Sequence, residues 1–260
     1  MSFTIDLEGR TALVTGAGQG VGRAIASALA SAGANVAVND FVPDRADAVV
    51  AEIQAAGGQA VATPFDVTDF DSLSARVAQL GNVDILVNNA GNAGPEGFNF
   101  GPFAESQPAD WDRYFGVNLF GVMKCTRAVL PGMIERQHGR IITIISDAAR
   151  WGEPNMSAYA ASKAGAAGFS RAIAREVGRH SVTVNCVALG TIDTADPQVA
   201  DDELSVEAME RIKRQVRPYI IRRRGRPDDI SGLVTFLASP LSSWITGQTY
   251  PVNGGYTVNQ

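Results

Sequence analysis

Two hydrophobic patterns alternate along the 260 residues of this chain. Short apolar runs such as Ile141-Ile-Thr-Ile-Ile145 predict strands that are buried on both faces, as in a parallel sheet. Longer segments with apolar residues three and four positions apart predict helices. Strands are expected near Ala12–Thr15, Asn35–Asn39, Ala60–Asp66, Asp84–Asn88, Arg140–Ser146, Thr183–Ala188 and Thr249–Val252. Helices are expected near Gly20–Ala32, Pro43–Ala56, Asp69–Leu80, Ala109–Arg136, Ser157–His180 and Asp228–Ala238.

This alternation predicts an α/β fold in a single domain over residues 1–260. The expected architecture is a Rossmann-type, doubly wound sheet of about seven mostly parallel strands with helices on both faces. No repeat, linker or low-complexity segment divides the chain. Ligands of such sheets bind outside the carboxyl ends of the strands. The residues at those predicted ends are Thr15, Asp40, Asp66, Asn88, Ser146 and Ala188.

Composition narrows the classes of function. Apolar residues make up 45% of the chain, which is enough for a sizeable core, but no run is long enough to predict a membrane span. The N-terminal residues lack the pattern of a signal peptide. Cys125 and Cys186 are expected to be buried free thiols, which fits a cytoplasmic protein. A net charge of −5 argues against nucleic acid as the main partner, and no His/Cys cluster has metal-ligand spacing.

A glycine-rich turn separates the first predicted strand from the first helix. It reads Thr15-Gly-Ala-Gly-Gln-Gly-Val-Gly22. Glycines at this place let the backbone approach a pyrophosphate, which then lies on the amide groups of the helix N-terminus. Asp40 closes the second strand, where a carboxylate can accept hydrogen bonds from the adenosine ribose and repel a 2′-phosphate. No Arg or Lys stands beside Asp40 in the sequence, so NAD is expected; Asp40 can also cap the following turn.

A tyrosine and a lysine lie four positions apart in a predicted helix. Tyr159 and Lys163 share one helix face, and Ser146 lies thirteen residues before the tyrosine. A phenol normally titrates near pH ~10, and a neighbouring cation lowers its pKa. Ser146 can then hydrogen-bond a substrate oxygen while Tyr159 moves the proton. The three residues indicate carbonyl–alcohol chemistry, although the same spacing also occurs on helices without a catalytic role.

Taken in order, the motifs resemble those of the classical short-chain dehydrogenases/reductases. They are Thr15-Gly-x-x-x-Gly20-x-Gly22, Asn88-Asn-Ala-Gly91, Asn118, Ser146, Tyr159 and Lys163, and the resemblance covers nearly the whole chain. It implies that Tyr159 is the acid/base, that Lys163 lowers its pKa and holds the nicotinamide ribose, and that Ser146 orients the substrate oxygen. Asn118 is then expected to bend its helix and to support a proton-relaying water.

The resemblance also implies a cofactor site and an assembly. Gln19 occupies a position that is often basic in relatives that prefer NADP, and Thr191 and Ile192 are expected at the nicotinamide carboxamide. A homotetramer is expected through the helices near 109–136 and 157–180, with a dimer as the alternative. The implied cofactor set is Gly16, Gln19, Gly20, Val21, Gly22, Asp40, Phe41, Asp66, Val67, Asn88, Ala90, Gly91, Tyr159, Lys163, Gly190, Thr191 and Ile192.

Three positions depart from the family pattern. Leu189 precedes Gly190 where proline is common, Asn253 stands where aspartate is frequent, and Asp147 follows Ser146 where many relatives have a small residue. Asp147 is expected either to contact substrate or to fix its own loop. The other candidates for a substrate-pocket wall are Trp151, Met156, Phe98, Phe100 and Phe103.

Residues 190–226 are expected to form a substrate lid, with Gly190 as a possible hinge. Eight of the 22 basic residues fall within sixteen positions at its end: Arg211, Lys213, Arg214, Arg217, Arg222, Arg223, Arg224 and Arg226. They are either a landing site for an anionic group such as coenzyme A, or a solvated face with interface salt bridges. Arg224 also matches a structural motif of the family, Arg224-Gly-x-Pro227.

The sequence therefore predicts an NAD-dependent oxidoreductase that interconverts a secondary alcohol and its ketone. Its substrate is expected to be alicyclic or a hydroxyacyl thioester. The alternative is an NADPH-dependent 3-oxoacyl-thioester reductase, which Asp40 disfavours. A non-catalytic nucleotide-binding regulator is less consistent with the presence of Ser146, Tyr159 and Lys163 together.

Overall fold

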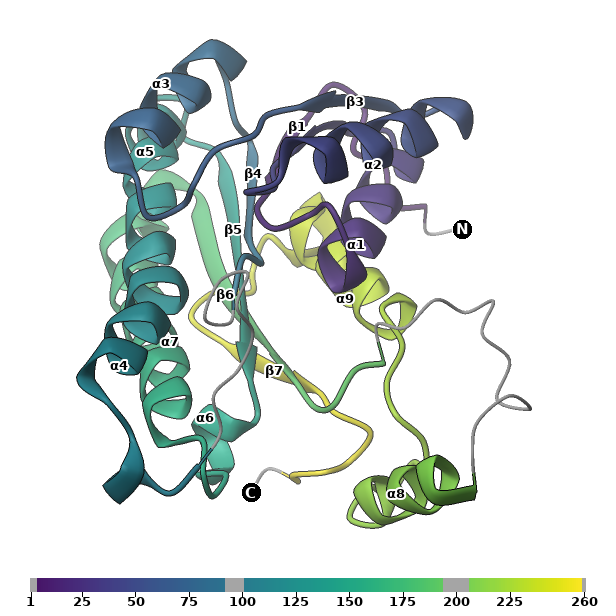
Figure 1. The fold of residues 1–260 in the computed structure, drawn as a ribbon. Helices are drawn as coiled ribbons and strands as arrows, with labels where there is room; N and C mark the ends of the chain where they lie inside the picture. The colour runs from purple at the N-terminus through teal and green to yellow at the C-terminus, as the bar shows by residue number, and fades with distance from the viewer. Residues whose placement is uncertain (1–3, 92–100, 194–205, 259–260) are drawn as a thin grey trace.

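Seven parallel strands form one sheet in the computed structural model of the protein, which describes residues 4–91, 101–193 and 206–258 (Figure 1). The strand order is β3-β2-β1-β4-β5-β6-β7, and every pair of neighbours is parallel. This confirms the predicted doubly wound sheet. The strands are β1 (Thr11–Val14), β2 (Asn35–Val38), β3 (Gln59–Ala62), β4 (Ile85–Asn88), β5 (Gly139–Ser146), β6 (Val182–Leu189) and β7 (Thr249–Val252).

Helices cover both faces of the sheet (Figure 1). Packing against one face are α1 (Gly20–Ser31), α2 (Pro43–Ala55) and α9 (Asp228–Ala238). Packing against the other are α3 (Phe70–Leu80), α5 (Val122–Glu135) and α7 (Ser157–Val177). The remaining helices are α4 (Pro108–Phe115), α6 (Ala148–Trp151) and α8 (Val206–Val216), with 3-10 turns at Phe103–Glu105, Gly178–His180 and Pro240–Ser242.

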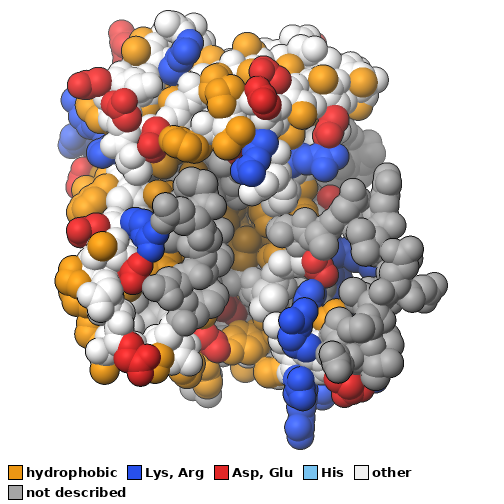
Figure 2. All heavy atoms as spheres, viewed as in Figure 1, with side chains coloured by type: hydrophobic (Ala, Val, Ile, Leu, Met, Phe, Trp, Pro, Cys, Tyr) orange, Lys and Arg blue, Asp and Glu red, His pale blue; other side chains and the backbone are white. Residues whose placement is uncertain are grey.

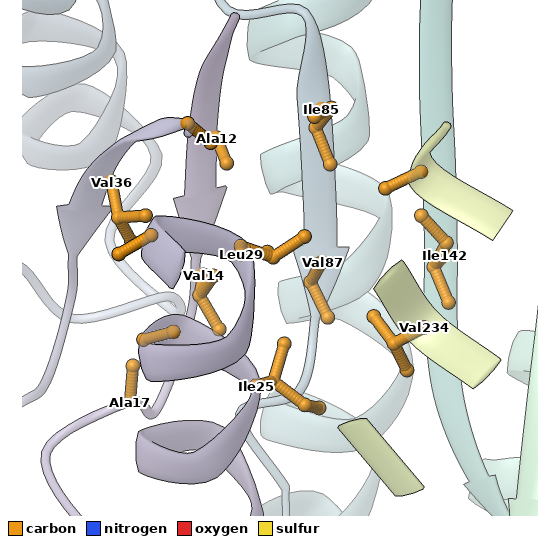
Figure 3. Close-up of a cluster of buried hydrophobic side chains, with 14 of the residues drawn as sticks. Ala12, Val14, Ala17, Ile25, Leu29, Val36, Ile85, Val87, Ile142 and Val234 are labelled. Atoms are coloured by element: carbon orange, nitrogen blue, oxygen red, sulfur yellow. The ribbon is translucent and has the colours of Figure 1, made fainter. Parts of the chain in front are cut away.

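The buried core explains why the strands read as continuous apolar runs. Ile25 and Leu29, one turn apart on α1, lie over Val14 of β1 and Val87 of β4, and all four side chains are fully buried (Figure 3). Each such side chain contributes roughly 1.5–3 kcal/mol when it leaves water. On β5, Ile142 packs into this layer while neighbouring Ile141 packs into the opposite one. Both faces of the strand must therefore be apolar.

The structure differs from the predicted elements mainly at their ends. The helix expected over 109–136 is interrupted by a π-helix, η2 (Gly116–Gly121). Hydrophobic periodicity cannot detect this, because one widened turn changes the spacing over only a few residues. The third strand ends at Ala62, so Asp66 lies beyond it. Cys125 and Cys186 are buried free thiols, as expected. None of the described helices is long and apolar enough to cross a bilayer.

Candidate active site

The glycine turn between β1 and α1 is packed so tightly that side chains are excluded. A Cβ atom at Gly22 would lie 2.3 Å from the Gly16 carbonyl oxygen and 2.4 Å from Asn89 Nδ2. Asn89 donates its side-chain amide to the carbonyl oxygens of Thr15 and Gly16, each at 2.9 Å. Sequence reasoning did not single out Asn89, although it belongs to the Asn88-Asn-Ala-Gly91 motif. Asn89, which directly follows β4, thus fixes the carbonyl groups at the start of the turn, and α1 begins at Gly20.

Asp40 lies against the same turn. Its carboxylate is 6% exposed and accepts hydrogen bonds from the Gly18 amide at 3.0 Å and the Val42 amide at 2.9 Å. The expected turn-capping role is therefore present. A Cβ atom at Gly18 would lie 2.6 Å from both Asp40 Oδ2 and Arg45 Cβ. The fold thus brings the stem of Arg45, from α2, next to Gly18, although the sequence shows no basic neighbour of Asp40.

The other members of the expected cofactor set have varied surroundings. Asp66 accepts hydrogen bonds from the Thr68 amide and hydroxyl at 2.7 and 2.8 Å. Asn88 donates to Thr126 Oγ1 at 3.2 Å, which ties β4 to α5.

Val67 is buried and Phe41 is 59% exposed. Gln19 is the N-cap residue of α1 but makes no side-chain capping bond. Val21 packs against the core and Ala90 adjoins Gly16.

Ser146, Tyr159 and Lys163 come together where β5 meets α7. Ser146 ends β5, and its side chain hydrogen-bonds the phenol of Tyr159. The hydroxyl of Ser146 also accepts a hydrogen bond from the Ala148 amide at 3.2 Å. One turn further along α7, Lys163 Nζ donates to the Ile144 carbonyl oxygen at 3.0 Å. The sequence prediction that these side chains share one site agrees with this geometry.

The electrostatics of the site differ from the expectation. Burial raises the pKa of Tyr159 above its ordinary value, and the hydrogen bond from Ser146 opposes that shift only in part. Burial also lowers the pKa of Lys163 to about 8. The lowered phenol pKa that the Tyr–Lys spacing predicted is thus not found in this structure. The reason is desolvation, because leaving water disfavours the charged form of both groups.

Asn118 lies on the π-helix and points toward Lys163. Its side chain is fully buried, and Nδ2 donates to Ser162 Oγ at 3.2 Å. A Cβ atom at Gly91 would lie 2.9 Å from Lys163 Nζ and 3.3 Å from Asn118 Oδ1. The ammonium and the amide therefore converge on one point at the end of β4. The local distortion expected at Asn118 takes the form of a widened helical turn.

The three substrate candidates have different surroundings. Met156 lines a cavity of about 150 Å³ together with Tyr159 and Tyr114, whose rings meet edge-on at 6.0 Å. Trp151 is 66% exposed on α6. Asp147 is 2% exposed and accepts hydrogen bonds from Arg150 Nη1 at 2.8 Å, from Thr257 Oγ1 at 2.9 Å and from Asn253 Nδ2. These contacts favour the loop-fixing role of Asp147.

Of the three candidate phenylalanines, Phe103 is the one that lies within the described residues. Phe103 stacks on Trp111 at 5.2 Å and lines a different, apolar pocket of about 340 Å³ with Phe115. That pocket is also lined by Ser157, Ala158 and Ala161 of α7, and it shares Ser157 and Ala158 with the cavity at Tyr159. Phe98 and Phe100 lie outside the described residues.

Three residues of the basic segment form salt bridges within the protein. Arg223 pairs with Asp229 at 2.5 and 2.8 Å, Arg224 with Asp193 at 3.3 Å, and Lys213 with Glu210 at 2.9 Å. Figure 2 shows Lys and Arg side chains over α8 and the segment that follows it. The exposed basic residues outside these pairs are Arg211, Arg214, Arg217, Arg222 and Arg226. Within the predicted lid, residues 194–205 lie outside the described residues.

Together the parallel sheet, the glycine turn and the Ser–Tyr–Lys cluster define a Rossmann-type oxidoreductase. Residues 10–204 match the family model described as short chain dehydrogenase, and the chain belongs to the short-chain dehydrogenase/reductase family.

Similar proteins cover nearly the full length of the chain. It is 40% identical to 7alpha-hydroxysteroid dehydrogenase of Escherichia coli K12 over 98% of this chain and 96% of that protein. It is 38% identical to a 3-oxoacyl-[acyl-carrier-protein] reductase of Synechocystis over 96% of this chain and 97% of that protein. A crystal structure from Agrobacterium tumefaciens, named for a proposed gluconate dehydrogenase activity, superimposes with a TM-score of 0.87 at 33% identity, covering 99% of this chain and 100% of that one.

Proposed function

We propose that this protein is an NAD-dependent oxidoreductase that interconverts a secondary alcohol and its ketone. The observation that carries the proposal is the hydrogen-bonded pair of Ser146 and Tyr159 beside the buried ammonium of Lys163. The proposal is further supported by the Escherichia coli relative, whose name describes a dehydrogenase of a hydroxysteroid, an alicyclic secondary alcohol.

In the direction of oxidation, Ser146 Oγ holds the substrate oxygen and the phenolate of Tyr159 takes the hydroxyl proton. When bound, NAD⁺ supplies the acceptor for the hydride that leaves the carbinol carbon as the carbonyl bond forms. Lys163, with a pKa of about 8, remains mostly protonated at neutral pH. Its positive charge favours the phenolate form of Tyr159. The side-chain amide of Asn118 lies beside the ammonium and can support a water that relays the proton.

The residues present fit a dinucleotide. A Cβ atom at Gly18 or Gly22 would clash with neighbouring protein atoms, so glycine is required at both positions. The amide groups at the start of α1 then suit a phosphate group. Asp40 is held beside that turn and favours ribose hydroxyls over a 2′-phosphate. The Cβ atom of Arg45 lies close by, and a guanidinium group at this end of the site would favour NADP. We assign the larger effect to Asp40, because its carboxylate is already fixed by two backbone amides.

Initial rates with NAD⁺ and NADP⁺ test the proposal across alicyclic secondary alcohols and 3-hydroxyacyl-CoA thioesters. NAD⁺ is expected to be preferred, and Asp40→Ala is expected to reduce that preference. Tyr159→Phe is expected to lower the rate about 10²- to 10⁴-fold while NAD⁺ still binds. Full activity of Tyr159→Phe would refute the assigned acid/base, and a preference for NADP⁺ would refute the role of Asp40.

The second candidate is an NADPH-dependent 3-oxoacyl-thioester reductase. The five exposed arginines of the lid segment favour it, since they can meet the phosphates of a thioester carrier. The Synechocystis relative is named for the reduction of such a substrate. Turnover of a 3-hydroxyacyl-CoA that falls steeply with added salt would support these arginines as its binding site. Turnover confined to uncharged alcohols would assign them to the solvated surface.

We also propose that the protein is a cytoplasmic homotetramer and that residues 190–226 act as its substrate lid. Phe120 on η2 and Met123 on α5 are 49% and 39% exposed, and Trp244 is 98% exposed. Large apolar side chains in contact with water often mark subunit contacts. Light scattering after size exclusion would measure the mass directly, and Phe120→Glu is expected to produce smaller species. A monomeric wild type would contradict the assembly.

A further inference from the structure

Tyr219 makes two hydrogen bonds to a single residue at the base of the lid. Its side chain is 5% exposed, and its hydroxyl accepts from the Thr191 amide at 2.9 Å and donates to Thr191 Oγ1 at 2.9 Å. Thr191 is separated from the end of β6 only by Gly190. The two bonds fix both the backbone and the side chain of Thr191.

The ring of Tyr219 occupies a slot between two glycines. A Cβ atom at Gly190 would lie 3.1 Å from Tyr219 Cε1 and 3.1 Å from Asn253 Cα. A Cβ atom at Gly254 would lie 3.2 Å from Tyr219 Cδ1. These glycines follow β6 and β7, so the ring is wedged between the loops at two neighbouring strand ends. Gly190, expected as a hinge, is packed from two sides.

A second aromatic ring extends this contact toward the catalytic helix. The ring of Tyr256 lies 4.9 Å from that of Tyr219, and its hydroxyl donates to Glu153 Oε2 at 2.6 Å. Glu153 stands between Ser146 and Tyr159 in the chain. The far end of the proposed lid also contacts Thr191, since the Gly225 amide donates to the Thr191 carbonyl oxygen at 3.0 Å. Thr191 is thereby linked, through Tyr219 and Tyr256, to the loop that precedes α7.

A hydroxyl that accepts one hydrogen bond keeps its own hydrogen free to donate. Because Tyr219 donates to Thr191 Oγ1, the hydrogen of that threonine hydroxyl is available for a bond to another acceptor. A carboxamide carbonyl oxygen is such an acceptor. Ordering the threonine in advance also removes part of the entropic cost of binding.

We propose that Tyr219 is a positioning residue for the nicotinamide end of the cofactor site, acting through Thr191. This rests on the proposed function, together with the expectation from the family resemblance that Thr191 and Ile192 contact the nicotinamide carboxamide. The adenosine end of the site, around Asp40 and Gly18, is formed by β2 and the glycine turn and does not involve Tyr219. Removal of the Tyr219 hydroxyl should therefore affect only one half of the dinucleotide.

Tyr219→Phe tests this, because it keeps the ring in its slot and deletes only the hydroxyl. Dissociation constants of NAD⁺ and of ADP-ribose, which lacks the nicotinamide, are measured by calorimetry for the wild type and the variant. NAD⁺ is expected to bind about 10-fold more weakly to the variant, with ADP-ribose changed less than about 2-fold. The KM for NAD⁺ is expected to rise in parallel. Tyr250→Phe is the matched control, because no described group hydrogen-bonds its hydroxyl, and it should change neither ligand.

Thr191→Val provides a second and independent test. It should cause the same selective loss of NAD⁺ binding, and the double variant should be no worse than either single one, because both remove one interaction. It also carries the test if Tyr219→Phe fails to fold. An equal loss for both ligands, or no loss for either, would overturn the positioning role. Failure of the wild type to bind NAD⁺ and ADP-ribose would instead refute the proposed function.

Discussion

Asn253 donates its side-chain amide to the buried carboxylate of Asp147, and these are two of the positions at which the chain departs from the family pattern. In this chain the carboxylate of the pair follows β5 and the amide follows β7. Arg150 and Thr257 complete the shell around the carboxylate.

Asp147→Ala is expected to destabilise the protein by about 3 kcal/mol, because it leaves Arg150 and Asn253 without their buried partner. Urea denaturation measures the loss. Asp112→Ala, at an exposed position, serves as the control and should change stability by less than about 0.5 kcal/mol.

The reciprocal exchange is the sharper test of this contact. Asp147→Asn combined with Asn253→Asp restores one carboxylate and one amide, and should be more stable than Asp147→Asn alone. If the double variant were less stable than the single one, the carboxylate would be needed at position 147 itself, and the contact with residue 253 would not explain its effect.

The phenol of Tyr159 is expected to ionise only above its ordinary pKa of ~10 in the cofactor-free protein, because burial raises its pKa. Ultraviolet titration of wild type minus Tyr159→Phe isolates this group. Ser146→Ala should move the titration to still higher pH, since the Ser146 hydrogen bond lowers the pKa. A titration step below the ordinary value would contradict the desolvation argument.

Lys163→Met is expected to stabilise the cofactor-free protein while abolishing turnover. Burial lowers the pKa of Lys163 from 10.5 to about 8, which corresponds to a cost of about 3 kcal/mol for keeping the ammonium buried. That cost is fully present below pH 8, falls as pH rises from 8 to 10.5, and is absent well above 10.5, where the lysine is neutral in both states. Denaturation of both proteins at neutral and alkaline pH measures it. A stability difference that does not shrink with rising pH would rule out this explanation.

Gly18→Ala is expected to weaken NAD⁺ binding at least about 10-fold, because the added methyl group would lie 2.6 Å from Asp40 Oδ2 and displace the glycine turn. Gly232→Ala is the matched control, since a Cβ atom at this exposed helical glycine meets nothing within 4 Å. Calorimetric titration compares the two. Unchanged affinity in Gly18→Ala would show that the turn does not hold the cofactor.

The sequence predicted the parallel sheet and the proximity of Ser146, Tyr159 and Lys163, because the patterns that indicate them lie within short stretches of sequence. Strand runs and helical periodicity are properties of short windows, and parallel strands bring their carboxyl ends to one edge. The fourfold spacing of Tyr159 and Lys163 places them on one helix face in any fold that contains that helix.

What the sequence did not predict depends on how elements dock. Arg45 adjoins Gly18 only because α2 turns back after β2, and Tyr219 reaches Thr191 across 28 positions through two loops. The direction of the Tyr159 pKa was missed for a similar reason. Spacing identifies a neighbouring cation, whereas the loss of water depends on the packing of the whole site.

The number of residues in the π-helical turn η2 sets the rotation of α5 relative to α4. A widened turn holds one residue more than a regular turn, and each residue rotates a helix by about 100°. Deleting a single residue between Gly116 and Gly121 would restore regular geometry but turn α5 about its axis relative to α4. Asn118 is buried beside Lys163 while Phe120, two residues on, is exposed. The extra residue of this turn therefore determines both that the Asn118 amide lies in the reaction centre and that the Phe120 ring lies on the surface.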